Sequence, residues 1–455
     1  MEVAKKKFYF KPSVNKYFPK LFTGTNSSSL YPEIFRGEGD RQMDILRFIT
    51  AGSVDDGKST LIGRLLYDSK SIMIDQLAAI EKQSKNKENG EIDLALLTDG
   101  LRAEREQGIT IDVAYKYFST PKRKFIIADA PGHIQYTRNM VTGASNAHLI
   151  IILIDARHGV VEQTRRHSII ASLLNIPQVI VAVNKMDLVN QSEEQYNNIV
   201  IEYANMAASL GLPHVHYIPI SAINGDNITE TSPNFPWYEG KCLLEILETV
   251  AVANETNYED ARFPVQYVIR PQLPHLHDYR GYAGKLISGV YKQGDKVTIL
   301  PSGQQTTISA IEVAGEEVPQ VFAPQSVVLH LADDIDVSRG DVILPTNNLP
   351  TVAQELEVIL CWMDKKPMQA GNKYLLQINS RVVKAVVKEI LYKLDVNTLA
   401  KEAAPQQAVL NDIVRVIIKT ASPVVFDSYN RLRENGGAIL IDETSNVTVG
   451  ACMIQ

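Results

Sequence analysis

The sequence predicts an α/β domain built on a parallel sheet, followed by two all-β barrel domains. From about Asp44 to Ala253, short apolar runs of strand length alternate with helix-length amphipathic segments. This is the pattern of a parallel sheet whose two faces are covered by helices. A glycine-rich loop lies between the first apolar run and the first helical segment. After about Phe263 the chain changes to short strand candidates separated by turns, which is typical of small barrels.

The overall composition excludes several classes of protein. The chain has 455 residues, of which 45% are hydrophobic and 22% charged, so it is globular rather than disordered. Its 46 Lys and Arg against 52 Asp and Glu give a net charge of −6, which argues against coating nucleic acid by bulk charge. No run approaches the roughly 18 apolar residues of a membrane span. Cys242, Cys361 and Cys452 fit neither a disulfide framework nor a thiolate metal site, which indicates a reducing, cytoplasmic compartment.

Residues 1–40 differ in amino-acid composition from the rest of the chain. They are rich in lysine, contain a Gly/Ser/Thr/Asn run over 24–29, and lack the apolar block of a secretory signal. We expect an extended N-terminal arm. It is either a solvated tail or, because Phe8, Tyr9 and Tyr17 make it more aromatic than a spacer, a partner-binding segment.

The rest of the chain divides into a predicted α/β domain over 41–255, a barrel over 260–347 and a second barrel over 350–455. In the first domain we expect strands at 45–50, 125–128, 149–154 and 179–183, and helices at 59–66, 163–174 and 194–210. In the barrels we expect strands at 265–269, 284–287, 296–300, 306–313, 326–331, 355–362, 373–378, 413–419 and 438–441.

The segment 52–59 reads Gly-Ser-Val-Asp-Asp-Gly-Lys-Ser and fits the phosphate-loop pattern G-x-x-x-x-G-K-[ST] in its required strand–loop–helix context. The glycines let the backbone wrap closely around phosphates, and the helix N-terminus supplies positive potential. Lys58 is expected to reach the β- and γ-phosphates, and the Ser59 hydroxyl to ligate Mg²⁺. The predicted phosphate-binding residues are Gly52, Ser53, Val54, Asp55, Asp56, Gly57, Lys58, Ser59 and Thr60.

A second motif, Asp129-Ala130-Pro131-Gly132-His133, follows the strand expected at 125–128. A carboxylate at the end of a buried strand beside a phosphate loop suits Mg²⁺, usually through water. The Gly132 amide is placed to sense a γ-phosphate. His133 stands where a residue that positions the attacking water would act.

Two further motifs point to guanine. In the segment 184–187, Asp187 can accept hydrogen bonds from both N1–H and the exocyclic amino group of guanine, a pair of donors that adenine lacks. Asn184 would brace the base and its loop, and the Lys185 stem would pack over the ring. Ala222 follows a strand-like run, and its main-chain amide is a donor aimed at a guanine oxygen. The residues predicted to hold the base are Asn184, Lys185, Met186, Asp187, Ser221 and Ala222.

Thr110 lies in an apolar stretch upstream of Asp129. A loop threonine at this point can close on Mg²⁺ and the γ-phosphate only when that phosphate is present, which makes an order–disorder switch. Lys58, Thr110 and His133 form the predicted catalytic set, and Ser59, Thr110 and Asp129 the predicted magnesium ligands. In this order the motifs predict an α/β P-loop GTPase domain that uses GTP and Mg²⁺.

Other polar clusters receive ordinary structural interpretations. His275 and His277 lie in a Pro-flanked loop without further ligands, so we expect no metal site there. Arg165, Arg166 and His167 are expected on a solvated helix face.

With these motifs in this order, followed by two β-barrels, the chain resembles translation-factor GTPases. Within that superfamily it looks most like the GTP-binding large subunit of bacterial sulfate adenylyltransferase (ATP sulfurylase). The likeness covers residues 41–454, and two departures are Ile134 in place of the usual Glu and Ala130 in place of a common Thr. The stretches that carry it are 52–66, 93–97, 103–115, 136–140, 154–157, 263–267 and 446–450.

The resemblance implies a division of labour within a heteromer. A separate small catalytic subunit would transfer the adenylyl group of ATP to sulfate and release pyrophosphate, while this chain hydrolyses GTP to drive that step. Two alternatives stay open: an aminoacyl-tRNA-binding elongation factor and a GTP-dependent assembly chaperone. Gln107 disfavours the first, because factors that deliver aminoacyl-tRNA usually carry Arg at this point. Nucleic acid and membranes are therefore not expected partners.

Overall fold

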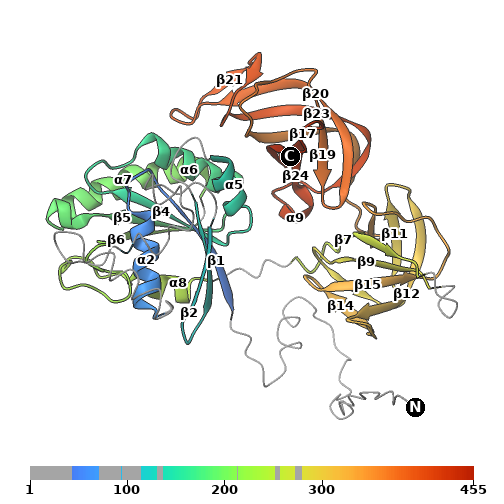
Figure 1. Cartoon of the computed structure of the whole chain (residues 1–455), viewed down its shortest axis with the longest axis horizontal. Helices are drawn as coiled ribbons and strands as arrows, with labels where there is room; N and C mark the ends of the chain where they lie inside the picture. The colour runs from blue at the N-terminus through green and yellow to red at the C-terminus, as the bar shows by residue number, and fades with distance from the viewer. Residues whose placement is uncertain are drawn as a thin grey trace, which may run out of the picture. The chain divides into compact units, whose positions relative to one another are not determined.

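The structure is a computed structural model that describes residues 44–70, 94, 114–130, 137–212, 214–251, 257–271 and 279–455. The arm expected over 1–40, the loop with Thr110, and residues 131–133 lie outside these ranges, as do His275 and His277. Within them, an α/β part is followed along the chain by two β-rich parts (Figure 1).

The α/β part is built on a six-stranded sheet with the order β2-β3-β1-β4-β5-β6. Five strands run parallel from β3 to β6, whereas β2 pairs antiparallel with β3 at the edge. The strands are β1 Ile45–Ala51, β2 Ala114–Ser119, β3 Lys124–Asp129, β4 Leu149–Asp155, β5 Gln178–Asn184 and β6 Val215–Pro219. All seven residues of β4 are buried, because it has strands on both sides and helices on both faces.

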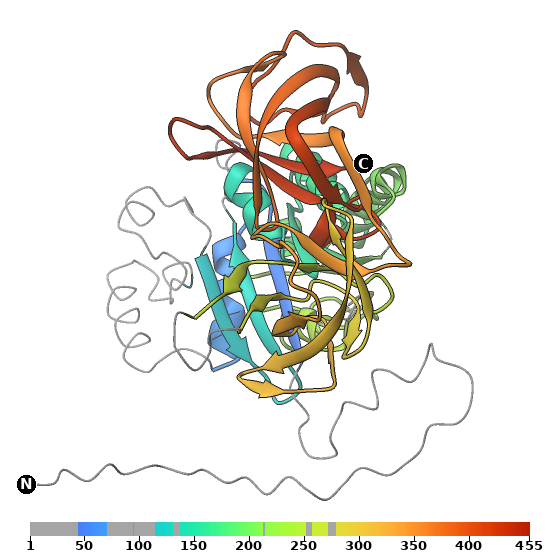
Figure 2. The same cartoon turned by 90° about the vertical axis from the view of Figure 1, so that its right-hand side faces the viewer.

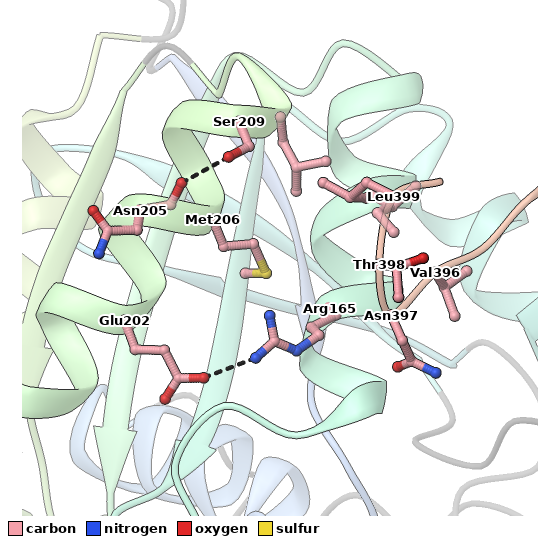
Figure 3. Close-up of a pocket in the computed structure, with 11 residues that line it drawn as sticks. Arg165, Glu202, Asn205, Met206, Ser209, Val396, Asn397, Thr398 and Leu399 are labelled. Carbon is pink, nitrogen blue, oxygen red and sulfur yellow. Dashed lines mark hydrogen bonds and ion pairs between the residues drawn. The ribbon is translucent and has the colours of Figure 1, made fainter. Parts of the chain in front are cut away.

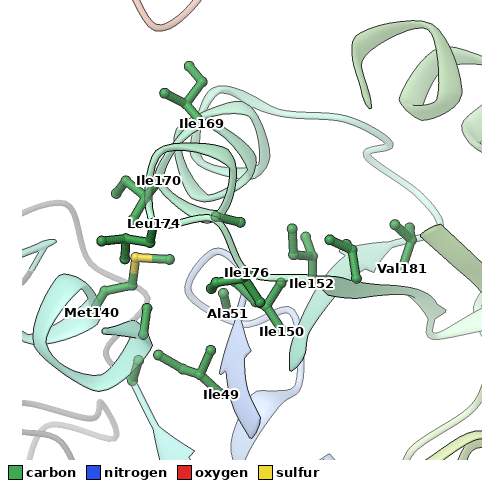
Figure 4. Close-up of a cluster of buried hydrophobic side chains, with 14 of the residues drawn as sticks. Ile49, Ala51, Met140, Ile150, Ile152, Ile169, Ile170, Leu174, Ile176 and Val181 are labelled. Atoms are coloured by element: carbon green, nitrogen blue, oxygen red, sulfur yellow. The ribbon is translucent and has the colours of Figure 1, made fainter. Parts of the chain in front are cut away.

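Helices cover the two faces of this sheet (Figure 1). They are α2 Lys58–Asp68, α5 Thr137–Ala144, α6 Glu162–Leu173, α7 Glu193–Leu210 and α8 Leu243–Thr249, with a short 3₁₀ turn, η3, at Met186–Val189. Apolar residues of α2 and α8 pack on one face, around Phe48 and Ile151. On the other face Met140 of α5 and Ile170 of α6 lie over Ile49 and Ile150 of the sheet (Figure 4).

Local sequence signals set the ends of the longest helix, α7. The Ser192 hydroxyl accepts a hydrogen bond from the Gln195 amide at 3.2 Å, which satisfies one of the unpaired donors at the helix start. Gly211 ends the helix in the left-handed conformation, with φ of +65°. Glycine is favoured there because it has no Cβ to clash.

The first β-rich part forms a sheet with the order β7-β16-β11-β12-β15-β9-β8; β13 pairs with β12, and β10 and β14 form a separate pair. The strands are β7 Phe263–Pro264, β8 Tyr267–Ile269, β9 Gly281–Lys285, β10 Val290–Lys292, β11 Lys296–Leu300, β12 Gln304–Val313, β13 Glu316–Glu317, β14 Gln320–Phe322, β15 Ser326–Leu331 and β16 Val342–Pro345. The single strand expected at 265–269 is wrong. The chain changes partners there, since β7 pairs with β16 and β8 with β9.

The second β-rich part has the order β19-β24-β25-β17-β23-β20-β21, and pairing of β19 with β20 closes six of these strands into a barrel. The curved strands are visible in both views (Figures 1 and 2). The elements are β17 Thr351–Trp362, β18 Met368–Gln369, β19 Lys373–Ile378, β20 Arg381–Leu394, β21 Lys401–Ala403, β22 Gln407–Ala408, β23 Ile413–Phe426, α9 Arg433–Gly436, β24 Gly437–Ile441 and β25 Thr448–Ile454. The barrel encloses a core around Leu360, Trp362 and Val416.

The expectation that residues 165–167 form a solvated face of α6 is wrong for two of the three. His167 is buried and its Nε2 lies 3.1 Å from Gln163 Nε2. The Arg166 guanidinium is only 10% exposed, because the turn at Asn411 covers it and accepts a hydrogen bond of 3.3 Å from it. Arg165 is more exposed and pairs with Glu202 at 2.8 Å.

The three cysteines are buried and none forms a disulfide. Among the described residues, no helix has the length and apolar character needed to cross a membrane.

Candidate functional site: a nucleotide-binding edge of the sheet

The candidate site lies where the carboxyl ends of β1, β3, β4 and β5 meet. The phosphate loop follows β1, while Asp129, Asp155 and Asn184 end the other three strands. The register pairs Thr50 with Asp129 near the ends of β1 and β3, and Asp155 with Asn184 at the ends of β4 and β5. Ala51, the last residue of β1, pairs with Ile152, so β4 and β5 extend beyond β1 and β3 at this edge. In open α/β sheets, this edge is where ligands bind.

The backbone of the phosphate loop requires its glycines. Gly57 immediately precedes α2 and has a φ of +91°, in the left-handed region. A Cβ at this position would come within 2.5 Å of the Asn184 amide nitrogen. Gly52 also lies close to the neighbouring strand, since its Cβ would meet the Leu153 carbonyl oxygen at 3.1 Å. The loop is therefore pressed against the ends of β4 and β5, and larger residues would displace it.

Lys58 is held inside the phosphate loop. Its ammonium donates hydrogen bonds to the Gly52 carbonyl at 3.0 Å and the Ser53 carbonyl at 2.7 Å. Burial lowers the pKa of Lys58, although the nearby carboxylates of Asp56 and Asp129 oppose that shift. The loop thus keeps a buried cation at the position where its motif places a phosphate-binding lysine.

Asp56 tightens the same loop. Its carboxylate accepts a hydrogen bond from the Ser53 amide. Burial raises the pKa of Asp56, although that hydrogen bond and the Lys58 charge oppose the shift.

The residues predicted to hold Mg²⁺ fit a hard cation as far as they are described. Asp129 is 1% exposed, and its charge acts on the buried Lys58. Ser59 lies in the first turn of α2, directly after Lys58. Hydroxyl and carboxylate oxygens are ligands that Mg²⁺ accepts, and it usually takes only one or two carboxylates with substrate phosphates. The described residues contain no cluster of three or more His, Cys, Asp or Glu that could hold a metal by itself.

Asn184 connects the phosphate loop to the segment at 221–222. Its amide nitrogen donates to the Asp56 carbonyl at 2.8 Å, and its amide oxygen accepts from the Ala222 amide at 3.0 Å. The carboxylate of Asp187 accepts from the Ser221 hydroxyl at 2.6 Å. The structure therefore brings together the phosphate loop and the two segments predicted to hold guanine.

Lys185 is fixed by a carboxylate to which sequence reasoning assigned no role. Asp155 accepts hydrogen bonds from Arg157 at 2.6 and 3.0 Å and pairs with Lys185 at 3.0 Å. Burial of Asp155 would raise its pKa, but the hydrogen bonds from Arg157 and Lys185 outweigh burial and hold the pKa below its usual range. The sequence signals for this role were the position of Asp155 at the end of β4 and its place in the family stretch 154–157.

Arg64 of α2 was also missed. Its guanidinium donates to the carbonyl oxygens of Ala222 and Ile223, far along the chain. Nothing near Arg64 in the sequence signals this contact.

Two described cavities lie away from these motifs. One, of about 360 Å³, is lined by α6, α7 and residues 396–399, with the ion pair of Arg165 and Glu202 on its wall (Figure 3). The other, of about 540 Å³, is lined partly by His214, His216 and Lys241. Neither contains a predicted site residue.

Residues 43–256 match the family described as the Elongation factor Tu GTP binding domain, and residues 355–455 match the GTP-eEF1A C-terminal domain-like family. With the phosphate loop and the guanine motifs at one edge of the sheet, these matches define a GTP-binding protein of the translation-factor type. The predicted fold class, an α/β P-loop GTPase domain followed by all-β barrel domains, is confirmed.

Proteins of similar sequence identify the family within that class. Sulfate adenylyltransferase subunit 1 of Bacteroides fragilis is 53% identical over 417 residues, which cover 91% of this chain and 87% of that protein. The same subunit of Teredinibacter turnerae is 53% identical and covers 90% and 87%. The chain belongs to the sulfate adenylyltransferase subunit 1 family.

Longer relatives exist. The bifunctional enzyme CysN/CysC of Mycobacterium tuberculosis (strain H37Rv) is 53% identical over 90% of this chain and 67% of that protein. A solved structure of Sup35 complexed with GMPPNP aligns with 92% of this chain and 97% of that chain at 24% identity, with a TM-score of 0.41, which is too low to add to the fold assignment.

Proposed function

We propose that this chain is the GTP-hydrolysing subunit of a cytoplasmic sulfate adenylyltransferase. In this proposal a separate small subunit converts ATP and sulfate to adenylyl sulfate and pyrophosphate, and GTP hydrolysis here drives that unfavourable step. The observation that carries it is the joining of the phosphate loop to the guanine segments through Asn184, in a chain 53% identical to named relatives of this kind.

The phosphate half of the site binds the charged end of the nucleotide. Gly52, Gly57 and the first turn of α2 present main-chain amides, and Lys58 would leave its loop carbonyls to contact the β- and γ-phosphates. Ser59 and Asp129 would hold Mg²⁺, the latter through water. When bound, Mg²⁺ neutralises charge that develops on the phosphate oxygens.

The base half of the site selects guanine. The Asp187 carboxylate, oriented by the Ser221 hydroxyl, would accept from N1–H and the exocyclic amino group. The Lys185 stem, fixed through Asp155, would pack over the ring. The Ala222 amide donates to Asn184 in this structure and would pass that hydrogen bond to the guanine oxygen when the base binds.

Hydrolysis itself is assigned to Thr110 and His133, on the motifs alone. Thr110 would close on the γ-phosphate side, and His133 would hold the attacking water in line. Coupling requires an element with two states that depend on the γ-phosphate. The Thr110 loop and the segment after Asp129 are our candidates for that element.

The test measures GTP hydrolysis by this chain alone and with a cognate small subunit, ATP and sulfate. We expect the rate to rise when all three are present, and adenylyl sulfate to accumulate only while GTP is hydrolysed. The variant His133→Ala should retain GTP binding but lose most of this hydrolysis. Hydrolysis unchanged by the small subunit, or tight GTP-dependent retention of aminoacyl-tRNA in a filter-binding assay, would contradict the proposal.

A further inference from the structure

Arg64 joins α2, the helix that begins at the phosphate loop, to residues 221–225. We call this segment, which is predicted to face the base, the base loop. Its Nε donates to the Ala222 carbonyl at 3.3 Å, and its Nη2 donates to the Ile223 carbonyl. The side chain is 20% exposed and also pairs with Asp68, one turn later on α2, at 3.7 Å. Asp68 is itself held by the Thr229 hydroxyl at 3.4 Å.

The two peptide groups on either side of Ala222 are fixed by different partners. In the first, the Ser221 carbonyl accepts from the Gly225 amide at 2.8 Å, which points the Ala222 N–H in the opposite direction, toward Asn184. This follows because the C=O and N–H of a trans peptide point in opposite directions. In the second, Arg64 alone among the described side chains holds the Ala222 carbonyl. Rotation of the first peptide would redirect the Ala222 amide, and release of the second would free Ala222 from α2.

The side chains that follow Ala222 add little anchoring to this loop. The Ile223 side chain is 58% exposed, so it contributes little apolar burial. Gly225 turns the chain with a φ of +84°, and a Cβ there would lie 3.7 Å from the Arg64 side chain. Beyond the buried Ala222 side chain and the hydrogen bonds of Ser221, the loop therefore depends on main-chain hydrogen bonds and on the packing of Arg64.

We propose that Arg64 is a positioning residue for guanine recognition: by holding the Ala222 carbonyl it fixes Ala222 relative to α2, so that the Ala222 amide can pass its hydrogen bond from Asn184 to the oxygen at position 6 of the base. Arg64 lies six residues after Lys58 on one rigid helix, about 9 Å along its axis at about 1.5 Å per residue. The positions of the phosphate loop and of the base loop are thus both set by α2. A planar guanidinium can serve two successive carbonyls at once, which a lysine ammonium does less well. This inference rests on the proposed GTP site.

The test compares dissociation constants for GTP, 6-thio-GTP and ITP in the full chain. 6-Thio-GTP keeps N1–H and the 2-amino group but replaces the oxygen at position 6 by a weaker acceptor, whereas ITP lacks only the 2-amino group that Asp187 would read. We expect the unmodified protein to prefer GTP over both analogues. Arg64→Ala should weaken GTP about tenfold and 6-thio-GTP much less, so that this preference shrinks while the GTP/ITP ratio stays.

Two further variants distinguish a positioning role of Arg64 from a general loss of structure in the site. Arg64→Lys should recover part of the preference for GTP over 6-thio-GTP. Asp68→Asn removes the ion pair but leaves the bonds from Arg64 to the carbonyls, so it should behave like the unmodified protein. An equal loss for all three nucleotides, or an unchanged GTP/6-thio-GTP ratio in Arg64→Ala, would overturn this inference alone. Failure of the unmodified protein to bind GTP would instead overturn the proposed function.

Discussion

The side-chain amide of Asn184 bridges Asp56 in the phosphate loop and Ala222 in the base loop, with hydrogen bonds of 2.8 and 3.0 Å. Asn184 is 2% exposed, so both bonds are shielded from water. One residue at the end of β5 thus sets the distance between the two halves of the nucleotide site.

We therefore expect Asn184→Ala to weaken GDP and GTP binding by at least tenfold. The substitution leaves a buried carbonyl and a buried amide without their partner, and each unsatisfied group costs about 1–3 kcal/mol. Titration with a fluorescent GDP analogue measures the affinity, and the thermal unfolding midpoint should also fall. Asn175→Ala is the matched control, because Asn175 donates to Asn430 on the exposed surface. Equal effects of the two substitutions would contradict the bridging role.

Lys58→Ala should abolish GTP binding or weaken it severely. The ammonium is the buried cation of the phosphate loop, and its removal leaves the nearby carboxylates of Asp56 and Asp129 uncompensated against an incoming phosphate. Isothermal titration with GTP measures the effect. Lys122→Ala, which removes an exposed lysine paired with Glu248 at 2.8 Å, should leave affinity unchanged. An affinity in Lys58→Ala equal to that of the unmodified chain would refute the phosphate role.

Asp187→Asn should shift the preference from GTP toward xanthosine triphosphate. Xanthine carries a carbonyl where guanine has its amino group, so an asparagine amide can donate where the aspartate accepted. Competition between the two nucleotides for the same site measures the shift. Ser221→Ala, which removes the 2.6 Å hydrogen bond that orients Asp187, should weaken GTP without reversing the preference. A guanine preference retained in Asp187→Asn would mean that another group reads the base.

The sequence predicted the parallel strands well because burial on both faces makes them continuous apolar runs. β1, β3, β4 and β5 all begin and end within one residue of the expected limits. β20 was missed because bulges near Val387 and Ile390 interrupt its alternation and leave both Lys388 and Glu389 exposed.

The residues of the candidate nucleotide site also fall into those that the sequence predicted and those that it did not. Residues within local motifs, such as Lys58 and Asn184, could be found from spacing alone. Arg64 reaches a carbonyl 158 positions away, and Asp155 pairs with Lys185 of the next strand end; only the folded chain creates these two contacts. The interpretation of His167 as solvated failed for the same reason, because tertiary packing covers that turn of α6.

The burial of His167 makes the stability of this chain depend on pH. Burial, together with the charges of Lys58 and Arg166, lowers the pKa of His167 to about 3. An unfolded histidine has a pKa of about 6.5. Between these values the unfolded chain binds the extra proton. The stability contributed by the neutral ring is therefore complete above about pH 6.5 and is lost as the pH falls toward 3.

His167→Gln should remove this dependence. From pH 7.5 to 5.5, the unmodified protein should lose about 1.4 kcal/mol more of its free energy of unfolding than the variant does, since that is the value of one pH unit below the unfolded pKa. Urea unfolding without nucleotide at both pH values measures the difference. His158→Gln is the matched control, because the His158 side chain is 64% exposed, and it should follow the unmodified protein. If His167→Gln loses stability as steeply as His158→Gln, protonation of His167 does not contribute, and the pH dependence of this chain arises from other titrating groups.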